Sequence, residues 1–461
     1  MLTRRKWIVL ACLGAVIATV AVLPYALPMS RLIPQVERAI EQRIHQPVSI
    51  GTLRLFILPV PHLQARTIAV GRGNLLDVDS ITIYPSVLTL LSDTKVIREV
   101  EVRGVRARFE LLGVARSLVS AEATQRTRAG ADQQGGIQLI RVTLRDVTLR
   151  FPTFALSGLS ADIALKDGKA TEIRASQQRD HLQLTARRQN GDTWSMDILA
   201  HDWKLPVGVP VQFDRLEGNA NITATGIEVR KLTGAFYGGT FTGPVSLGWK
   251  SGWSLAGHLQ IDGIDLEPAV ALVNREVAMS GKMTAAPSFT SQSREAANLL
   301  NELQLESDFA VEHGVLHKID LVAATKNPLD RKAGKGGKTE FDELKGHVVF
   351  EQHTYEFSDL HIASGLFRAQ GEVTVNPDKT LGGVIRAELR GTAALVSIPF
   401  DLSGKIGDPS LFPTRGAMAG AVAGTMLMPG IGTAVGMKAG EWTERLLGRR
   451  KPNRRQTPAP K

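Results

Sequence analysis

Residues 334–339 read GKGGKT and resemble the end of a phosphate-binding loop. The complete loop is Gly-x-x-x-x-Gly-Lys-Thr between a strand and a helix, because backbone amides at the helix N-terminus hold the phosphates. Gly337, Lys338 and Thr339 are in register, but Lys332 stands where the first glycine is required. The polar EFDELK that follows leads into the strand-like HVVFEQ, so no helix is expected there. We therefore predict that 326–339 is a flexible, solvated loop that binds no nucleotide.

The sequence also gives little support for a metal site or for cysteine chemistry. His313 and His317 are spaced i, i+4, which would place two metal ligands on one face of a helix. However, Gly314 lies between them and the segment reads as strand and turn, so both histidines are expected to face solvent. Cys12 is the single cysteine, which excludes an intrachain disulfide and a zinc-cysteine cluster. No Gly-x-Ser-x-Gly sequence and no recognisable pair of catalytic carboxylates occurs, and we predict no enzyme activity, cofactor or metal.

The net charge of +10 is concentrated at the two ends of the 461-residue chain. Residues 4–6 supply three positive charges, and six more lie in 449–461. The body between them is therefore almost neutral, which argues against nucleic acid as a partner.

The segment from Trp7 to Leu27 contains no charged residue and is long enough to cross a bilayer as a helix. Arg4, Arg5 and Lys6 precede it, so residues 1–28 are predicted to be a cytoplasmic stub and an inner-membrane anchor, with everything downstream exported. A signal peptide cleaved after Ala21 is the alternative that the sequence leaves open. A lipoprotein site at Cys12 is disfavoured, because the apolar run continues well past it.

The next segment, 29–46, has the pattern of an amphipathic helix. Its apolar residues recur at helical spacing, and its other face is charged. These residues are Leu32, Ile33, Val36, Ala39, Ile40 and Ile44. The helix is expected either to cover the core that follows or to lie along the membrane surface.

From residue 47 to 414 the dominant period is two, which predicts a mainly β body with one apolar and one polar face. The alternation slips at Gly104 and at Asp146, as it does at β-bulges or tight turns. Short helices are expected near 268–275 and 293–303, and 119–136 reads as a second flexible loop. Repeated hairpins of one kind favour an elongated, largely antiparallel sheet.

The apolar positions of the first strands could line a groove or simply fill a core. The candidate lining residues are Leu53, Leu55, Ile57, Ile81, Ile83, Val100, Val102, Ala107, Phe109, Val142 and Leu144.

The order of these segments resembles the AsmA family of bacterial cell-envelope proteins. The resemblance is carried by the N-terminal anchor and helix, and by VSIGTLRLFILPVPHLQARTIAVG and VIREVEVRGVRARFEL. GAFYGGTFTGPVSLGW, VEHGVLHKIDLVAATK and IPFDLSGKIGDPSLFPT continue it, over most of residues 1–414. It implies a single-pass inner-membrane protein with a periplasmic β-rich body, related to bridge-type lipid transfer proteins whose curved sheet forms an apolar trough. It also implies a role in outer-membrane assembly and lipid homeostasis.

Two functions follow as hypotheses. The first is a non-enzymatic protein that binds or conveys phospholipid for the outer membrane. The second is a scaffold or assembly factor for outer-membrane proteins that carries no lipid. A sustained apolar face favours the first, because phospholipid chains need shielding from water.

The segment 415–448 contains two runs of glycines four residues apart, with Pro429-Gly430 between them. Such spacing places a flat groove on one helical face and permits close packing of another helix. We predict a glycine-zipper helical hairpin that inserts shallowly or self-associates, followed by a basic disordered tail at 449–461. The packing glycines are Gly416, Gly420, Gly424, Gly432, Gly436 and Gly440.

Overall fold

The computed structural model describes residues 29–427 apart from 45, 72–74, 90, 91, 93, 109–136, 152–154, 178–180, 207, 274–278, 331, 366 and 390–396. The predicted span 7–27, the loop 119–136, Phe109, Cys12 and the second glycine run (Gly432, Gly436 and Gly440) therefore lie outside the described residues. Among the residues that are described, no helix is long and apolar enough to cross a membrane. The chain is mainly β, as the alternation predicts, and divides into two units.

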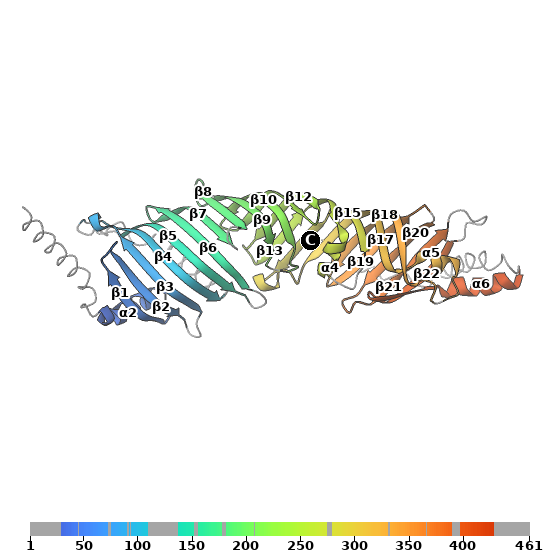
Figure 1. Cartoon of the computed structure of the whole chain (residues 1–461), viewed down its shortest axis with the longest axis horizontal. Coiled ribbons are helices and arrows are strands. Elements are labelled where there is room, and N and C mark those ends of the chain that lie inside the picture. The colour runs from blue at the N-terminus through green and yellow to red at the C-terminus, as the bar shows by residue number, and fades with distance from the viewer. Residues whose placement is uncertain are drawn as a thin grey trace, which may run out of the picture. The chain divides into compact units, whose positions relative to one another are not determined.

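The first unit is a sheet whose strands lie side by side in chain order (Figure 1). A 3₁₀ turn, η1 (Met29–Leu32), leads into helix α2 (Ile33–Ile44), and a second 3₁₀ turn, η2 (Val87–Thr89), follows β3. The strands are β1 (Val48–Phe56), β2 (His62–Val70), β3 (Leu76–Pro85), β4 (Lys95–Arg108), β5 (Ile137–Arg150), β6 (Ala155–Lys166), β7 (Lys169–Gln177), β8 (Leu182–Arg188), β9 (Trp194–Lys204) and most of β10 (Gln212–Thr223).

Each of β1 to β8 pairs with the next strand along the chain. All of these pairs are antiparallel except β4 with β5, which is parallel. The sheet is therefore largely antiparallel, as predicted, but mixed. Both predicted phase slips are present, because Gly104 and Asp146 have φ angles of 65° and 56°. Thr67 on β2 also has a positive φ angle, 55°. Each of these three residues lacks a register partner on a neighbouring strand. The local distortions of β2, β4 and β5 therefore lie at matching positions of the sheet.

Helix α2 forms where the amphipathic pattern predicts it and packs on the sheet through its apolar side. Ile33, Val36, Ile40 and Ile44 contact a buried cluster of Val48, Ile50, Ile68 and Val78. Two carboxylates of the helix also bind the outer edge of β1. Glu41 accepts a hydrogen bond from the amide of Val48 at 2.9 Å, and Glu37 accepts one from the amide of Ile50 at 2.8 Å. These bonds satisfy edge amides that would otherwise be open to pairing with another chain.

The described part of the second unit contains the remaining strands and three helices. Its strands are β11 (Gly226–Phe236), β12 (Gly239–Gly248), β13 (Trp253–His258), β14 (Gln260–Asp265), β15 (Met279–Ala285), β16 (Ser288–Ser293), β17 (Gln304–Ile319), β18 (Lys335–Glu351), β19 (Thr354–Ala363), β20 (Phe367–Val375), β21 (Leu381–Leu389), β22 (Ser397–Lys405) and β23 (Asp408–Pro413). Its helices are α4 (Leu266–Val273), α5 (Leu321–Lys326) and α6 (Arg415–Leu427), and η3 (Ala296–Asn298) is a 3₁₀ turn. Strands β17 to β23 pair in chain order, all antiparallel.

Two predictions about local structure in this unit hold and two do not. The helix expected near 268–275 is α4, and residues 416, 420 and 424 lie in helix α6. The helix expected at 293–303 is only the short turn η3. The predicted loop 326–339 is too long, because turns occupy the described residues between α5 and β18, but β18 begins at Lys335 and 335–339 pairs with β17.

The glycines of 334–339 allow α5 to pack closely against β18, which explains why this strand has the composition of a loop. A Cβ on Gly337 would lie 2.6 Å from the Cβ of Asp320, the N-cap of α5. Thr339 is only 1% exposed, and its hydroxyl donates to the carbonyl of Ile319 at 2.8 Å while accepting from the amide of Leu321 at 3.0 Å. The composition that resembles a phosphate loop therefore serves a strand-to-helix contact.

Candidate functional site

The cross-strand register of the first unit aligns apolar side chains in continuous rows that run across the strands. Residues directly opposite each other on neighbouring strands project from the same face of a sheet. The first row passes through Leu53, Ala65, Ile81, Val102, Leu144, Ala161, Ala175, Leu184 and Ile198. The second passes through Leu55, Leu63, Ile83, Val100, Val142, Ile163, Ile173, Ala186 and Met196. We call these two rows together the apolar face.

The side chains of the apolar face are neither fully buried nor fully exposed to solvent. Every member of both rows is half-buried except Ala186, which is buried. Residues that fill a protein core are almost completely removed from water. The apolar face is therefore continuous over nine strands and keeps partial exposure to solvent along most of its length.

Helix α2 covers only the beginning of the neighbouring rows. Beyond the irregularities at Thr67 and Gly104, Ile50, Ile68 and Val78 continue on the same face and are buried beneath the helix. The same row then reaches Val105 and Val147, which are half-buried again. The helix thus covers one corner of this side of the sheet, over β1 to β3 and next to the apolar face.

The predicted lining residues fall on this face with few exceptions. Eight of them belong to the two rows: Leu53, Leu55, Ile81, Ile83, Val100, Val102, Val142 and Leu144. Ala107 lies on a further row with Val48, Val70 and Leu76 and is buried. Ile57 follows the end of β1 and is half-buried, and Phe109 lies outside the described residues.

Sequence reasoning stopped too early along the chain, because the rows continue through β6 to β9. Alternation in the segments 159–165, 172–176, 182–186 and 195–199 carries the signal that would have extended the list. Gln177 interrupts the row that begins at Ile50. It is 3% exposed, and its Oε1 accepts a hydrogen bond from Trp203 Nε1 at 3.1 Å.

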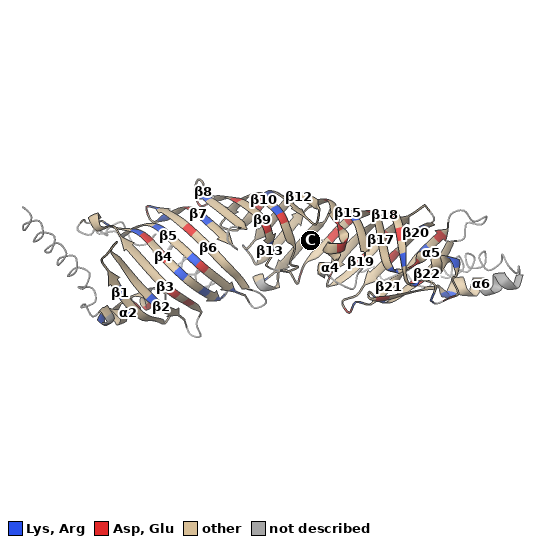
Figure 2. Ribbon diagram, viewed as in Figure 1, with Lys and Arg blue, Asp and Glu red and all other residues tan. Residues whose placement is uncertain are grey.

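Residues that alternate with the two rows project from the opposite face of the first unit. Many of them are polar, and acidic and basic residues are interspersed along β4 to β7 (Figure 2). Arg103 pairs with Glu101 at 2.6 Å, Arg106 with Asp79 at 2.6 Å, and Arg145 with Asp162 at 3.1 Å. The Glu101 and Asp79 carboxylates raise the pKa values of Arg103 and Arg106 further, chiefly through these hydrogen bonds.

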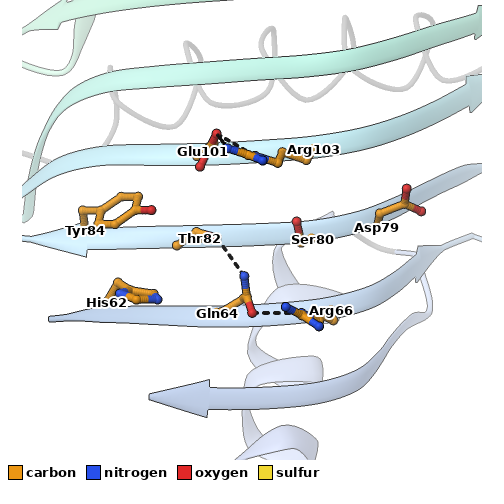
Figure 3. Close-up of a pocket in the computed structure, with 9 residues that line it drawn as sticks. All are labelled: His62, Gln64, Arg66, Asp79, Ser80, Thr82, Tyr84, Glu101 and Arg103. Atoms are coloured by element: carbon orange, nitrogen blue, oxygen red, sulfur yellow. Dashed lines mark hydrogen bonds and ion pairs between the residues drawn. The ribbon is translucent and has the colours of Figure 1, made fainter. Parts of the chain in front are cut away.

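A shallow hollow lies on this polar face over β2, β3 and β4 (Figure 3). It is lined by His62, Gln64, Arg66, Asp79, Ser80, Thr82, Tyr84, Glu101 and Arg103. The lining side chains bond mainly to each other: Arg66 Nε donates to Gln64 at 2.8 Å, and Gln64 Nε2 donates to Thr82 at 3.5 Å. These pairings are those of a solvated sheet surface, and the hollow lacks the enclosed apolar lining typical of small-molecule sites.

The second unit also has an apolar face, but helices fill much of it. A row passes through Met283, Val311, Leu344, Ile362, Ala369, Ala387 and Ile398. Val311 and Leu344 are buried with Leu266 of α4. Leu321 of α5 and Ala417 and Ala421 of α6 belong to the cluster that buries the far end of the row. This part of the second unit is a closed core.

Toward the end of β18 and the start of β19 the second unit is less tightly closed. Phe350, Tyr355 and Phe357 are half-buried and lie on the same face as Leu344. Phe350 and Tyr355 have ring centroids 4.6 Å apart, and burial raises the pKa of Tyr355 above its usual range. These rings form a second, smaller apolar surface.

The residues whose spacing resembles a metal site or a phosphate-binding loop lie on strands. His313 and His317 lie on β17, and no group of three or more metal-binding side chains occurs among the residues that the structure describes. Lys338 is an exposed strand residue, not a loop residue, and pairs with Glu340 at 2.6 Å. No protein-family model, curated protein or solved structure matches this sequence.

Proposed function

We propose that this chain is an AsmA-like protein of the bacterial inner membrane whose apolar face binds phospholipid acyl chains in the periplasm. The observation that carries the proposal is the pair of half-buried apolar rows across β1 to β9. The N-terminal segment 7–27 anchors the chain, and the phospholipid serves the maintenance or assembly of the outer membrane. The protein acts as a binder or conveyor and not as an enzyme.

The dimensions of the face suit an acyl chain. Eight strand-to-strand steps of about 4.8 Å give each row a length of roughly 38 Å. One leaflet of a bilayer is about 15 Å of hydrocarbon, half of the usual thickness. Each row is therefore long enough for an extended chain with room to move along it. Shielding a chain from water is worth about 0.8 kcal/mol for each CH₂ group, so a half-buried face of this length supplies a substantial driving force.

The lipid is tested by native mass spectrometry of the detergent-purified full chain. Wild-type protein is expected to retain phospholipid. Two adjacent residues on β9 provide a matched pair of variants, because Ile198 lies in the first row while Leu199 is 51% exposed on the opposite face. Ile198→Asp is expected to lose the lipid and Leu199→Asp to keep it.

Absence of lipid from folded wild-type protein would contradict the proposal and favour the scaffold hypothesis instead. Equal lipid retention by both variants would show that the lipid binds elsewhere.

The anchor is tested separately with a reporter fused after residue 112. A reporter that works only in the periplasm is expected to be active at this position. If only a cytoplasmic reporter works there, the compartment and the proposed function are both wrong.

A further inference from the structure

Several large apolar side chains are exposed at one end of the first unit, on the connections between strands. Leu58 and Val60 follow β1 and are 45% and 38% exposed. Val87 and Leu88 follow β3 and are 52% and 94% exposed. Leu32 of η1 is 42% exposed. A single exposed leucine needs no explanation, but several on neighbouring connections mark an interaction surface.

The pairing register places the two connections beside each other. The β1–β2 connection joins Phe56 to His62, which are themselves a cross-strand pair. The pair Leu63 with Ile83 then sets the start of β2 against the end of β3. The connections after β1 and after β3 therefore leave the sheet at the same end.

Helix α2 brings the N-terminal segment to this same end. Glu41 binds the amide of Val48 and Glu37 binds that of Ile50, so the helix runs antiparallel to β1. Its N-terminus and η1 consequently point toward the Phe56 end of β1. One residue separates the end of the predicted membrane span, residue 27, from the start of η1. We call Leu32, Leu58, Val60, Val87 and Leu88 the loop patch.

The residues around the loop patch have the composition of a membrane interface. Residues 57–61 and 86–92 contain no charge. Three aromatic rings lie at the strand ends that these connections join. The ring centroids of Phe56 and His62 are stacked 4.7 Å apart, and those of His62 and Tyr84 are 5.4 Å apart. Aromatic side chains with a polar tip concentrate where the hydrocarbon meets the headgroups. Arg31, Arg54 and Lys95 are exposed on the elements that border these connections and favour an anionic surface.

We propose that the loop patch inserts into the headgroup region of the membrane that anchors the chain. This inference rests on the proposed anchoring by 7–27. Interfacial elements of this kind bury their apolar side by about 5–10 Å, which matches connections only a few residues long. Insertion sets the second apolar row, which begins at Leu55 and Leu63 beside the patch, against the membrane surface. Acyl chains then pass from the leaflet to the apolar face without crossing open water.

The test places an environment-sensitive fluorophore on single cysteines in the full chain, with Cys12→Ser as background. Leu88→Cys and Val60→Cys report on the patch. Leu199→Cys and Leu329→Cys are matched controls, because they are 51% and 55% exposed but lie elsewhere. Each protein is reconstituted into vesicles of phosphatidylethanolamine and phosphatidylglycerol that carry a quencher on the acyl chains near the headgroup.

Probes on Leu88→Cys and Val60→Cys are expected to lose most of their fluorescence, and both control probes to keep it. Equal fluorescence at all four positions would overturn the inference and would indicate that the patch contacts a protein or solvent. Protein that does not float with the vesicles would overturn both the inference and the anchor. Lipid retention on the apolar face is measured separately by mass spectrometry, so failure of the loop patch is distinguishable from failure of lipid binding.

Discussion

Replacing one valine by aspartate on the apolar face distinguishes an accessible surface from a sealed core. Val102 lies in the middle of the first row, between Ile81 and Leu144, and is half-buried. Val311 is the same residue type on the corresponding face of the second unit, but it is 1% exposed and packed with Leu266, Phe341 and Leu344. The pair Val102→Asp and Val311→Asp therefore makes one chemical change in two environments.

The expected losses of stability differ because water reaches only one of the two sites. Full burial of a valine side chain is worth about 1.5–3 kcal/mol, so a half-buried one contributes roughly 1 kcal/mol, which Val102→Asp forfeits. Its carboxylate can stay hydrated and adds little further cost. At Val311 the same change loses the full burial of the valine and also buries a carboxylate without partners. The expected loss in the free energy of unfolding is about 4 kcal/mol or more.

Hydrogen exchange of the backbone amides of β4 and β17 measures each loss in its own unit. Val102→Asp is expected to remain folded at normal levels and to lose co-purifying phospholipid. Val311→Asp is expected to lose protection throughout the neighbouring strands. If Val102→Asp destabilises β4 as severely as Val311→Asp destabilises β17, the apolar face is closed to ligands and the proposal loses its physical basis.

Three further predictions concern single contacts. Glu37→Ala combined with Glu41→Ala should weaken the docking of α2 by about 1–3 kcal/mol and speed exchange of the β1 edge amides, whereas Arg38→Ala, on the exposed side, should not. Lys338→Ala should leave both the melting temperature and envelope function unchanged, and loss of function in normally expressed protein would reopen the nucleotide hypothesis. The pKa of Asp378 is lowered by hydrogen bonds from the hydroxyl and amide of the threonine two residues on, so its stabilisation of that turn is present at neutral pH and is lost as the pH falls through the depressed value. An amide of this turn that exchanges equally fast at neutral pH and at acidic pH, after correction for intrinsic rates, would contradict that assignment.

The β architecture and its irregularities are visible in the sequence because both depend on local chemistry. Alternation of apolar and polar residues reports one buried and one wet face. Gly104 and Asp146 reveal the phase slips because their residue types tolerate a positive φ. The amphipathic helix is equally readable, since its apolar stripe is what packs on the sheet.

The features that sequence reasoning misses depend on contacts between distant segments. The glycine-rich 334–339 resembles a loop, yet pairing with β17 and packing against Asp320 hold it in a strand. The parallel pairing of β4 with β5 has no local signal either. Glu37 and Glu41 look like the solvent face of a helix, but they bind the edge of β1.

What covers each apolar face determines whether that face can be a binding site, and alternation alone cannot report it. In the second unit, α4, α5 and α6 each contribute side chains that complete a core against the row through Val311 and Ala387. In the first unit, α2 packs on the buried cluster of β1 to β3, and the residues of the two rows of the apolar face stay half-buried except for Ala186. A half-buried apolar surface of that extent still carries a cost in water, which a bound apolar ligand would remove. A mobile acyl chain satisfies this requirement better than a fixed protein partner, because the rows present no charged or hydrogen-bonding group that would hold a partner in one position.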